Sequence, residues 1–122
     1  MRYRFDKDKA TVVFGETGAV DFDRSQNGLV IGLDAQTKIV SVTFVNPVKR
    51  AATGEVDIVL SYDADADVLV IELDGADYRE SAEAPLGHIV DFNDRQEIVG
   101  VEFLQATRRF APDAIRQFRA AA

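Results

Sequence analysis

The chain contains an internal repeat. Residues 28–50 align without a gap with residues 87–109, an offset of 59, and six of these 23 pairs are identical. Upstream, residues 5–14 align with residues 62–71 at an offset of 57, so two residues are inserted between the blocks. A repeat of this length restricts the fold to one built from two copies of the same unit. The identical pairs are Gly28/Gly87, Ile39/Ile98, Val40/Val99, Val42/Val101, Phe44/Phe103 and Arg50/Arg109.

Both copies carry the signals of short β-strands. In residues 55–62, Val56, Ile58, Leu60 and Tyr62 alternate with other side chains, which is the period of a half-buried strand. Residues 34–38 and 93–97 have the composition of hairpin loops. The sequence predicts a mainly β fold in which each unit is an antiparallel meander of four or five strands. Strands are expected at 11–14, 20–22, 29–33 and 39–45 in the first copy, and at 55–62, 68–73, 88–92 and 98–104 in the second.

The repeat also predicts how the units pack. A unit of about 50 residues is marginally stable alone and needs a partner to cover its sheet. We therefore expect a single globular domain over residues 1–122, with a first repeat (1–54), a second repeat (55–110) and a C-terminal helix (111–122). The two meanders would form a pseudo-two-fold sandwich or a barrel. Such a chain is an internal pseudo-dimer and can be monomeric, although a homodimer stays open.

Helical signals are confined to two segments. In residues 111–119, Pro112 suits the first helical position and Asp113 the positive end of the helix dipole. Ile115 and Phe118 share one face, which is expected to lie on the sheet. Residues 46–54 are predicted to hold one helical turn closed by Gly54.

Charge and composition exclude several classes of protein. Residues 1–54 carry a net charge of +2, whereas residues 55–122 carry −9, and the acidic surface of 55–107 disfavours binding to nucleic acid. No apolar run is long enough to cross a membrane, and the charged N-terminus does not resemble a signal peptide. The absence of cysteine fits a cytoplasmic protein. Neither a phosphate-binding nor a dinucleotide-binding motif occurs, so no cofactor is predicted.

Asp63, Asp65 and Asp67 resemble the alternating carboxylates of a calcium-binding loop. The glycine expected at the sixth position of such a loop is Val68 here, and the chain continues directly into a predicted strand. A turn in which the aspartates bind nearby backbone N–H groups is the favoured interpretation, and a weak cation site is the alternative.

His88, Asp91 and Glu102 are the side chains most suited to acid–base chemistry. His88 is the single histidine and is expected at the surface, on the opposite strand face from Asp91. Asp91 and Glu102 interrupt apolar strands; outward-facing positions explain them more simply than a catalytic pair does. No nucleophile–base set is visible, so the chain is not expected to be an enzyme.

Four arginines follow the second repeat: Arg108, Arg109, Arg116 and Arg119. They could bind an acidic partner. Docking of the C-terminal segment onto the acidic second half is the favoured alternative.

The second half resembles a short bacterial family known as domain of unknown function 2283. The resemblance covers about residues 60–110 and is carried by Tyr62-Asp63, by residues 67–73, by residues 87–92 and by residues 98–104 (IVGVEFL). The first half resembles it as a diverged copy, with Ser41 for Gly100, Thr43 for Glu102 and Ala10 for Asp67. The resemblance implies no known activity, cofactor or catalytic residue. It implies at most an antitoxin-like or regulatory partner protein.

Together these observations predict a non-enzymatic, cytoplasmic protein that acts by binding another protein through the acidic surface of 55–107 or the exposed edge strands. The alternative from another class is a small-molecule or metal-binding module, with the ligand held between the repeats.

Overall fold

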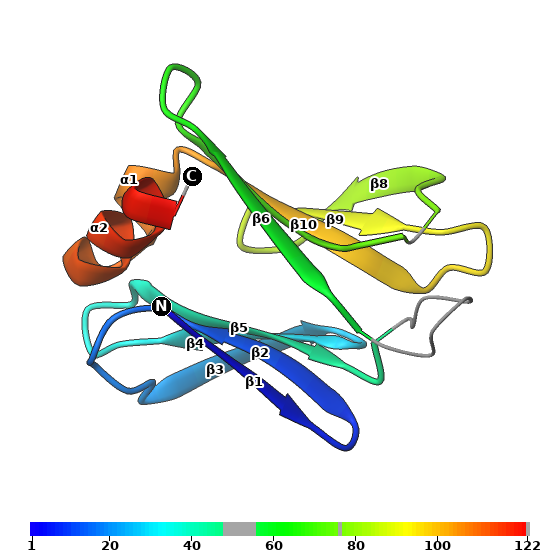
Figure 1. Cartoon of the computed structure of the whole chain (residues 1–122), viewed down its shortest axis with the longest axis horizontal. Coiled ribbons are helices and arrows are strands. Elements are labelled where there is room, and N and C mark those ends of the chain that lie inside the picture. The colour runs from blue at the N-terminus through cyan, green and yellow to red at the C-terminus, as the bar shows by residue number, and fades with distance from the viewer. Residues whose placement is uncertain (48–55, 76, 122) are drawn as a thin grey trace.

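The computed structural model of the chain describes residues 1–47, 56–75 and 77–121, which form two five-stranded antiparallel sheets and two short helices (Figure 1). Sheet A contains β1 (Arg2–Asp6), β2 (Lys9–Val13), β3 (Asp21–Gln26), β4 (Leu29–Leu33) and β5 (Ile39–Val45). Sheet B contains β6 (Ile58–Asp63), β7 (Val68–Leu73), β8 (Glu80–Glu83), β9 (Ile89–Phe92) and β10 (Ile98–Leu104). The helices are α1 (Ala106–Arg109) and α2 (Pro112–Ala121).

The two sheets have the same strand order: β1-β2-β5-β4-β3 in one and β6-β7-β10-β9-β8 in the other. The predicted mainly β fold of two packed units is confirmed, and the sheets stay separate, so the barrel alternative is wrong. The simple meander is also wrong, because the fifth strand of each unit returns to the middle of its sheet. These central strands, β5 and β10, have neighbours on both edges, and they contain four and five buried residues, the largest numbers in their sheets.

The pairing registers show that the two units are equivalent residue by residue. Val12 lies opposite Val42, and Ile71 lies opposite Val101, so both strands of the second pair sit 59 residues further along. The ladder between the fourth and fifth strands is interrupted by one residue in each unit, between Gly32 and Leu33 in sheet A and between Ile98 and Gly100 in sheet B. The repeat therefore extends to the irregularities of the sheet.

The registers also locate the two-residue insertion. Asp6 pairs with Lys9 across a short turn, whereas Asp63 pairs with Val68 across a turn that is two residues longer. The first strands are thus equivalent at an offset of 57 and the second strands at 59. The alignment of residues 5–14 with 62–71 is right for β1 and wrong for β2. Consequently the equivalent of Ala10 is Leu69, not Asp67.

Two edge strands, β1 and β8, were not predicted from the sequence. β1 and β8 are exposed along their whole length. Neither has a buried apolar face, and so neither shows the alternation on which strand prediction depends. Both have charged side chains, which protect a sheet edge from pairing with other chains.

One apolar core lies between the sheets and extends under the helices. In Figure 1 both helices lie at one end of the sandwich. There Phe110 makes edge-to-face contacts with Phe14 at 5.2 Å, Phe103 at 5.0 Å and Phe118 at 5.3 Å between ring centroids. The predicted start of the C-terminal helix at Pro112 is confirmed, and Phe118 packs against Tyr62 of β6 at 4.7 Å. The turn predicted for 46–54 falls mostly on 48–55, outside the described residues.

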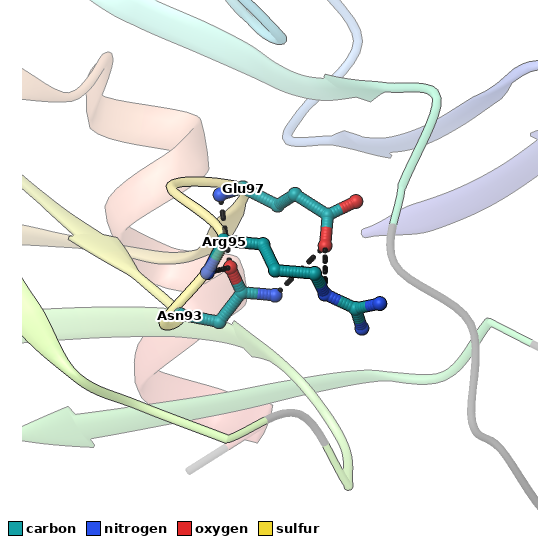
Figure 2. Close-up of polar contacts among 3 residues, drawn as sticks. All are labelled: Asn93, Arg95 and Glu97. Atoms are coloured by element: carbon teal, nitrogen blue, oxygen red, sulfur yellow. Dashed lines mark hydrogen bonds and ion pairs between the residues drawn. The ribbon is translucent and has the colours of Figure 1, made fainter.

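The hairpin loops predicted at 34–38 and 93–97 are formed alike. Asp34 Oδ1 accepts the N–H groups of Gln36 and Lys38, both at 2.9 Å. Asn93 Oδ1 accepts those of Arg95 at 3.0 Å and Glu97 at 2.9 Å (Figure 2). Each loop is closed by one short polar side chain that substitutes for missing backbone partners.

Candidate functional site

The outer faces of the two sheets differ in charge. Outward positions follow from the register, because they alternate with the buried core residues of each strand. The outer face of sheet A has four basic residues and one acidic residue, whereas that of sheet B has five carboxylates and no basic residue among the described strands. These are Arg2, Arg4, Lys9, Arg24 and Asp6 on sheet A, and Asp63, Glu72, Glu83, Asp91 and Glu102 on sheet B.

Three of these carboxylates gather around Gly100 of β10. Gly100 lies opposite Glu72 on one neighbouring strand and opposite Asp91 on the other, and Glu102 follows two residues later on the same face. A Cβ at position 100 would lie 3.2 Å from Glu72 Cβ and 3.3 Å from Asp91 Oδ2. Glycine is therefore the residue that leaves room for the two acidic side chains to face each other. We name Glu72, Asp91 and Glu102 the carboxylate cluster.

A hydrogen-bonded chain fixes the cluster on one side. The hydroxyl of Ser81 donates to Asp91 Oδ1 at 2.7 Å, and Tyr78 Oη lies 2.9 Å from Ser81 Oγ. Asp91 is only 8% exposed. A hydrogen bond with Asp91 raises the pKa of the Glu102 carboxyl to about 7, and burial and the negative charges of Asp91 and Glu72 act in the same direction. The Glu102 carboxyl therefore keeps its proton beside Asp91 up to near neutral pH.

The cluster lies in a hollow of about 270 Å³ that mixes carboxylates with apolar and aromatic groups, lined by Val70, Glu72, Leu73, Tyr78, Asp91, Val99 and Glu102. Sheet A has a hollow of about 280 Å³ at the equivalent place, where Val13 replaces Glu72 and Ser41 replaces Gly100. Arg2 and Arg4 line that second hollow. The carboxylate cluster is thus a property of the second half alone.

From the sequence, Asp91 and Glu102 were expected to be outward-facing residues without a joint role. The structure places them outward and also brings them together. Glu72, Ser81 and Tyr78 were missed. Comparison of β7 with β2 at the offset of 59 would have indicated Glu72, because a carboxylate there replaces Val13.

The aspartates of the β6–β7 turn do not converge. Asp63 Oδ1 accepts the N–H groups of Asp65 at 3.0 Å and Ala66 at 3.2 Å, as the turn interpretation requires. Asp67 points elsewhere, toward Tyr62 and Thr107. Across residues 1–47, 56–75 and 77–121, no three His, Cys, Asp or Glu side chains are grouped so that they could hold a metal ion.

Hydrogen bonds to the Asp67 carboxylate instead connect α1 to the β6–β7 hairpin. Its carboxylate accepts the hydroxyl of Thr107 at 2.6 Å, the N–H of Thr107 at 3.1 Å and the hydroxyl of Tyr62 at 2.8 Å. Burial alone would raise the pKa of Asp67, but the hydrogen bonds from Thr107 and Tyr62 and the charge of Arg119 lower it below its usual value. The carboxylate at the end of the longer turn of the second half therefore joins this turn to α1.

The four C-terminal arginines have different environments. Arg109 is used internally, since Nε donates to the Leu104 carbonyl and Nη1 to the Leu86 carbonyl, both at 2.7 Å. The charge of Arg119 acts on the Tyr62 hydroxyl and the Asp67 carboxylate, lowering the pKa of each against the effect of burial. Arg108 and Arg116 are exposed. Docking of this segment onto the second half thus accounts for Arg109 and Arg119.

His88 is buried, and its predicted surface position is wrong. It is 2% exposed, stacks on Phe103 at 5.5 Å, and its Nε2 has no hydrogen-bond partner. The register places it at the equivalent of Leu29, a core position in sheet A. Burial lowers the pKa of His88, opposed by the charge of Asp23 and reinforced by that of Arg109.

A small polar hollow lies between loops of the two units. It measures about 210 Å³ and includes Asn27, Asn46, Gln96 and Glu97 in its lining. It sits beside the Asn93–Glu97 loop of Figure 2, where Glu97 Oε1 accepts Asn93 Nδ2 at 3.0 Å and pairs with Arg95 at 3.3 Å. A larger hollow of about 460 Å³ lies beside the β1–β2 hairpin, where Phe5 and Ala10 of the first unit and Val56 of the second are among its lining residues. The apolar core occupies the centre of the space between the sheets.

Residues 60–106 match the sequence model of a family described as "Protein of unknown function (DUF2283)". The match begins within β6 and ends at the first residue of α1, so it covers most of sheet B. The resemblance stated from sequence for the second half is confirmed. Searches of curated proteins and of solved structures return no match. Neither α1 nor α2 has the length and apolar character needed to cross a membrane, and no other helix occurs in the described part of the chain.

Proposed function

We propose that the chain is a protein-interaction module that binds a cationic segment of its partner on the outer face of sheet B. The carboxylate cluster carries this proposal. In the described residues no basic side chain pairs with Glu72, Asp91 or Glu102, and the negative charge is concentrated enough that Glu102 keeps its proton up to about pH 7. A lysine or arginine from a partner would replace that proton and relieve the repulsion.

The surroundings of the cluster suit a long basic side chain. Val70 and Leu73 offer apolar contact to its methylene groups, and Tyr78 offers an aromatic ring. Val59 and Leu104 extend the apolar surface on the same face, at 40% and 42% exposure. Apolar contacts beside unpaired charge are what a protein interface of moderate strength requires.

The alternative, a small molecule or metal held between the repeats, has less support. The apolar core fills the centre of the space between the sheets, and the hollow of about 460 Å³ beside the β1–β2 hairpin is lined mostly by the first unit, with Val56 and Asp57 from the second. No group of metal-ligating side chains occurs among the described residues. An enzyme would need a nucleophile or a second catalytic group beside the protonated Glu102.

The test is calorimetric titration with a defined probe, an acetylated pentapeptide of alternating lysine and leucine. Glu72→Gln/Glu102→Gln should weaken binding at least about fivefold, and binding at pH 7 should release protons into the buffer. The matched control, Glu80→Gln/Asp94→Asn, changes the net charge equally but lies off the outer face, and should alter affinity by less than about twofold. Equal weakening by both pairs would mean that the probe senses net charge, and the proposal would fail.

A further inference from the structure

The outer faces of sheets A and B are complementary to each other. They lie on opposite sides of the sandwich, and the register gives them opposite charge, with Arg2 and Arg4 in the hollow of sheet A and the carboxylate cluster in the hollow of sheet B. Because the two units share strand order and register, both hollows are built on the same backbone frame. Two faces of the same frame and opposite charge can lie against each other with their charged positions aligned.

Apolar surface accompanies the charge on both faces. Phe22 is 46% exposed on sheet A, with the Arg24 guanidinium 5.1 Å from its ring centroid. On sheet B, Val59 and Leu104 are exposed to a similar degree. Packing of one sheet face on another buries such side chains, as in the core of a sandwich.

We infer that the cationic partner of sheet B is a second copy of this chain, which docks the outer face of its sheet A on the carboxylate cluster. The inference rests on the proposed function and names the partner for the same site. Because the two faces point in opposite directions, the contact is head-to-tail, so two copies cannot satisfy both faces of each other. Each added copy therefore presents a free face, and association grows with concentration.

The salt dependence separates this contact from general effects of charge. The whole chain carries a net charge of −7, so copies repel each other and salt screens this repulsion. Association driven by apolar contact alone would therefore become stronger as the salt concentration rises. Association through complementary faces should decrease with salt instead.

The experiment is sedimentation velocity on the full chain between about 10 μM and about 1 mM, at about 20 mM and about 500 mM salt. At low salt the average mass should rise with protein concentration above the 13.4 kDa of one chain. At high salt the average mass should return toward that of one chain. Arg2→Glu/Arg4→Glu and Glu72→Lys/Glu83→Lys each change exposed residues and should each weaken association at least about tenfold. The matched control Arg2→Lys/Arg4→Lys keeps the charge and should self-associate like the unchanged chain.

A mixture of the two charge-reversed variants gives the sharpest outcome. The first variant keeps an intact acidic face and the second an intact basic face, and their two reversed faces are again opposite in charge. An equimolar mixture should therefore regain the association that each variant alone has lost. The inference is overturned if the unchanged chain stays monomeric in low salt up to about 1 mM. It is also overturned if the chain forms a closed dimer whose stability neither pair of charge reversals changes. If the chain is monomeric but the lysine–leucine peptide still binds through Glu72 and Glu102, the inference fails while the proposed function stands.

Discussion

The hydroxyl of Thr107 donates a 2.6 Å hydrogen bond to Asp67, a residue 40 positions earlier in the chain. This contact joins the start of α1 to a turn that is two residues longer than its counterpart in sheet A. Asp67 adopts a positive φ of 54°, which places it where both Tyr62 and Thr107 can reach its carboxylate. The longer turn thus gives the second half a means of holding the helices over its end of the core.

Removal of the Asp67 carboxylate should therefore destabilise the fold. Asp67→Ala leaves two hydroxyls and one backbone N–H without their acceptor, and we expect a loss of about 2–3 kcal/mol in the free energy of unfolding, measured by urea denaturation. Asp65→Ala in the same turn is the control and should cost less than about 0.5 kcal/mol, because the Asp65 side chain accepts no hydrogen bond from the described residues. Equal losses of stability in the two variants would show that the aspartates stabilise the turn itself and that the contact of Asp67 with Thr107 contributes little.

The raised pKa of Glu102 predicts a stability that depends on pH. Between pH 4.5, its ordinary pKa, and about 7 the native protein holds a proton that the unfolded chain has released. The free energy of unfolding should therefore fall as the pH rises through this range. Glu102→Gln should remove this dependence and, at pH 8, be more stable than the unchanged protein by about 1 kcal/mol, after allowance for solvent screening. Denaturation curves at pH 5 and pH 8 measure both effects. A Glu102→Gln variant that retains the full dependence on pH contradicts the raised pKa of Glu102.

His88 should make the free energy of unfolding depend on pH in the opposite direction. Its pKa is lowered in the native state, so below pH 6.5, its ordinary value, the unfolded chain takes up a proton that the native chain refuses. Stability from this residue is lost as the pH falls. His88→Leu copies Leu29 of the first unit and removes a buried nitrogen without a partner, and should gain about 1 kcal/mol at pH 5 in thermal or urea denaturation. A variant less stable than the unchanged protein at pH 5 would show that the imidazole has a role beyond filling the core.

Gly87 should tolerate no side chain. Its φ is +93°, and a Cβ there would lie 2.9 Å from Arg109 Nη2, the guanidinium that binds the Leu86 and Leu104 carbonyls. Gly87→Ala should lower the free energy of unfolding by about 1–2 kcal/mol in urea denaturation. Gly18→Ala is the matched control, since nothing lies within 4 Å of its Cβ, and it should be neutral or slightly stabilising. A neutral Gly87→Ala would mean that Arg109 can move away at no cost.

Calcium should leave the protein unchanged. Asp63 and Asp67 are occupied by turn and helix contacts and point apart, so a cation would have to break these contacts to bind. The thermal midpoint should be the same with and without millimolar calcium, because a ligand of the native state raises it. A rise in the midpoint that is lost in Asp65→Ala would restore the cation site.

The apolar residues of the repeat were sufficient to predict the mainly β architecture. Ile39, Val42 and Phe44 and their equivalents are buried in the central strands, as their identity in both halves indicated. The edge strands were beyond such reasoning, because β1 and β8 have no buried face to produce a pattern. Strand order was equally hidden: the return of β5 between β2 and β4 is set by which strand gains most from central burial.

For the candidate site, sequence alone identified residues but not their relation. Asp91 and Glu102 stood out as carboxylates in apolar strands, yet their closeness depends on the register that puts Gly100 beside Asp91. His88 was misplaced because a polar side chain at the start of a strand is usually exposed; its equivalence to Leu29 was the available signal. Arg109 was paired with Arg50 by the repeat, but its capping of two carbonyls required the tertiary contact with the loop at Leu86.

The separation of basic and acidic residues onto opposite outer faces gives the molecule an electric dipole directed through the sandwich, perpendicular to both sheets. A body with such a dipole rotates in the field of a charged neighbour before the two touch, and so arrives with one chosen side forward. Two sheets of the same strand order and register thus present different charges to the solvent, and the two sides of the molecule are not interchangeable for a charged partner.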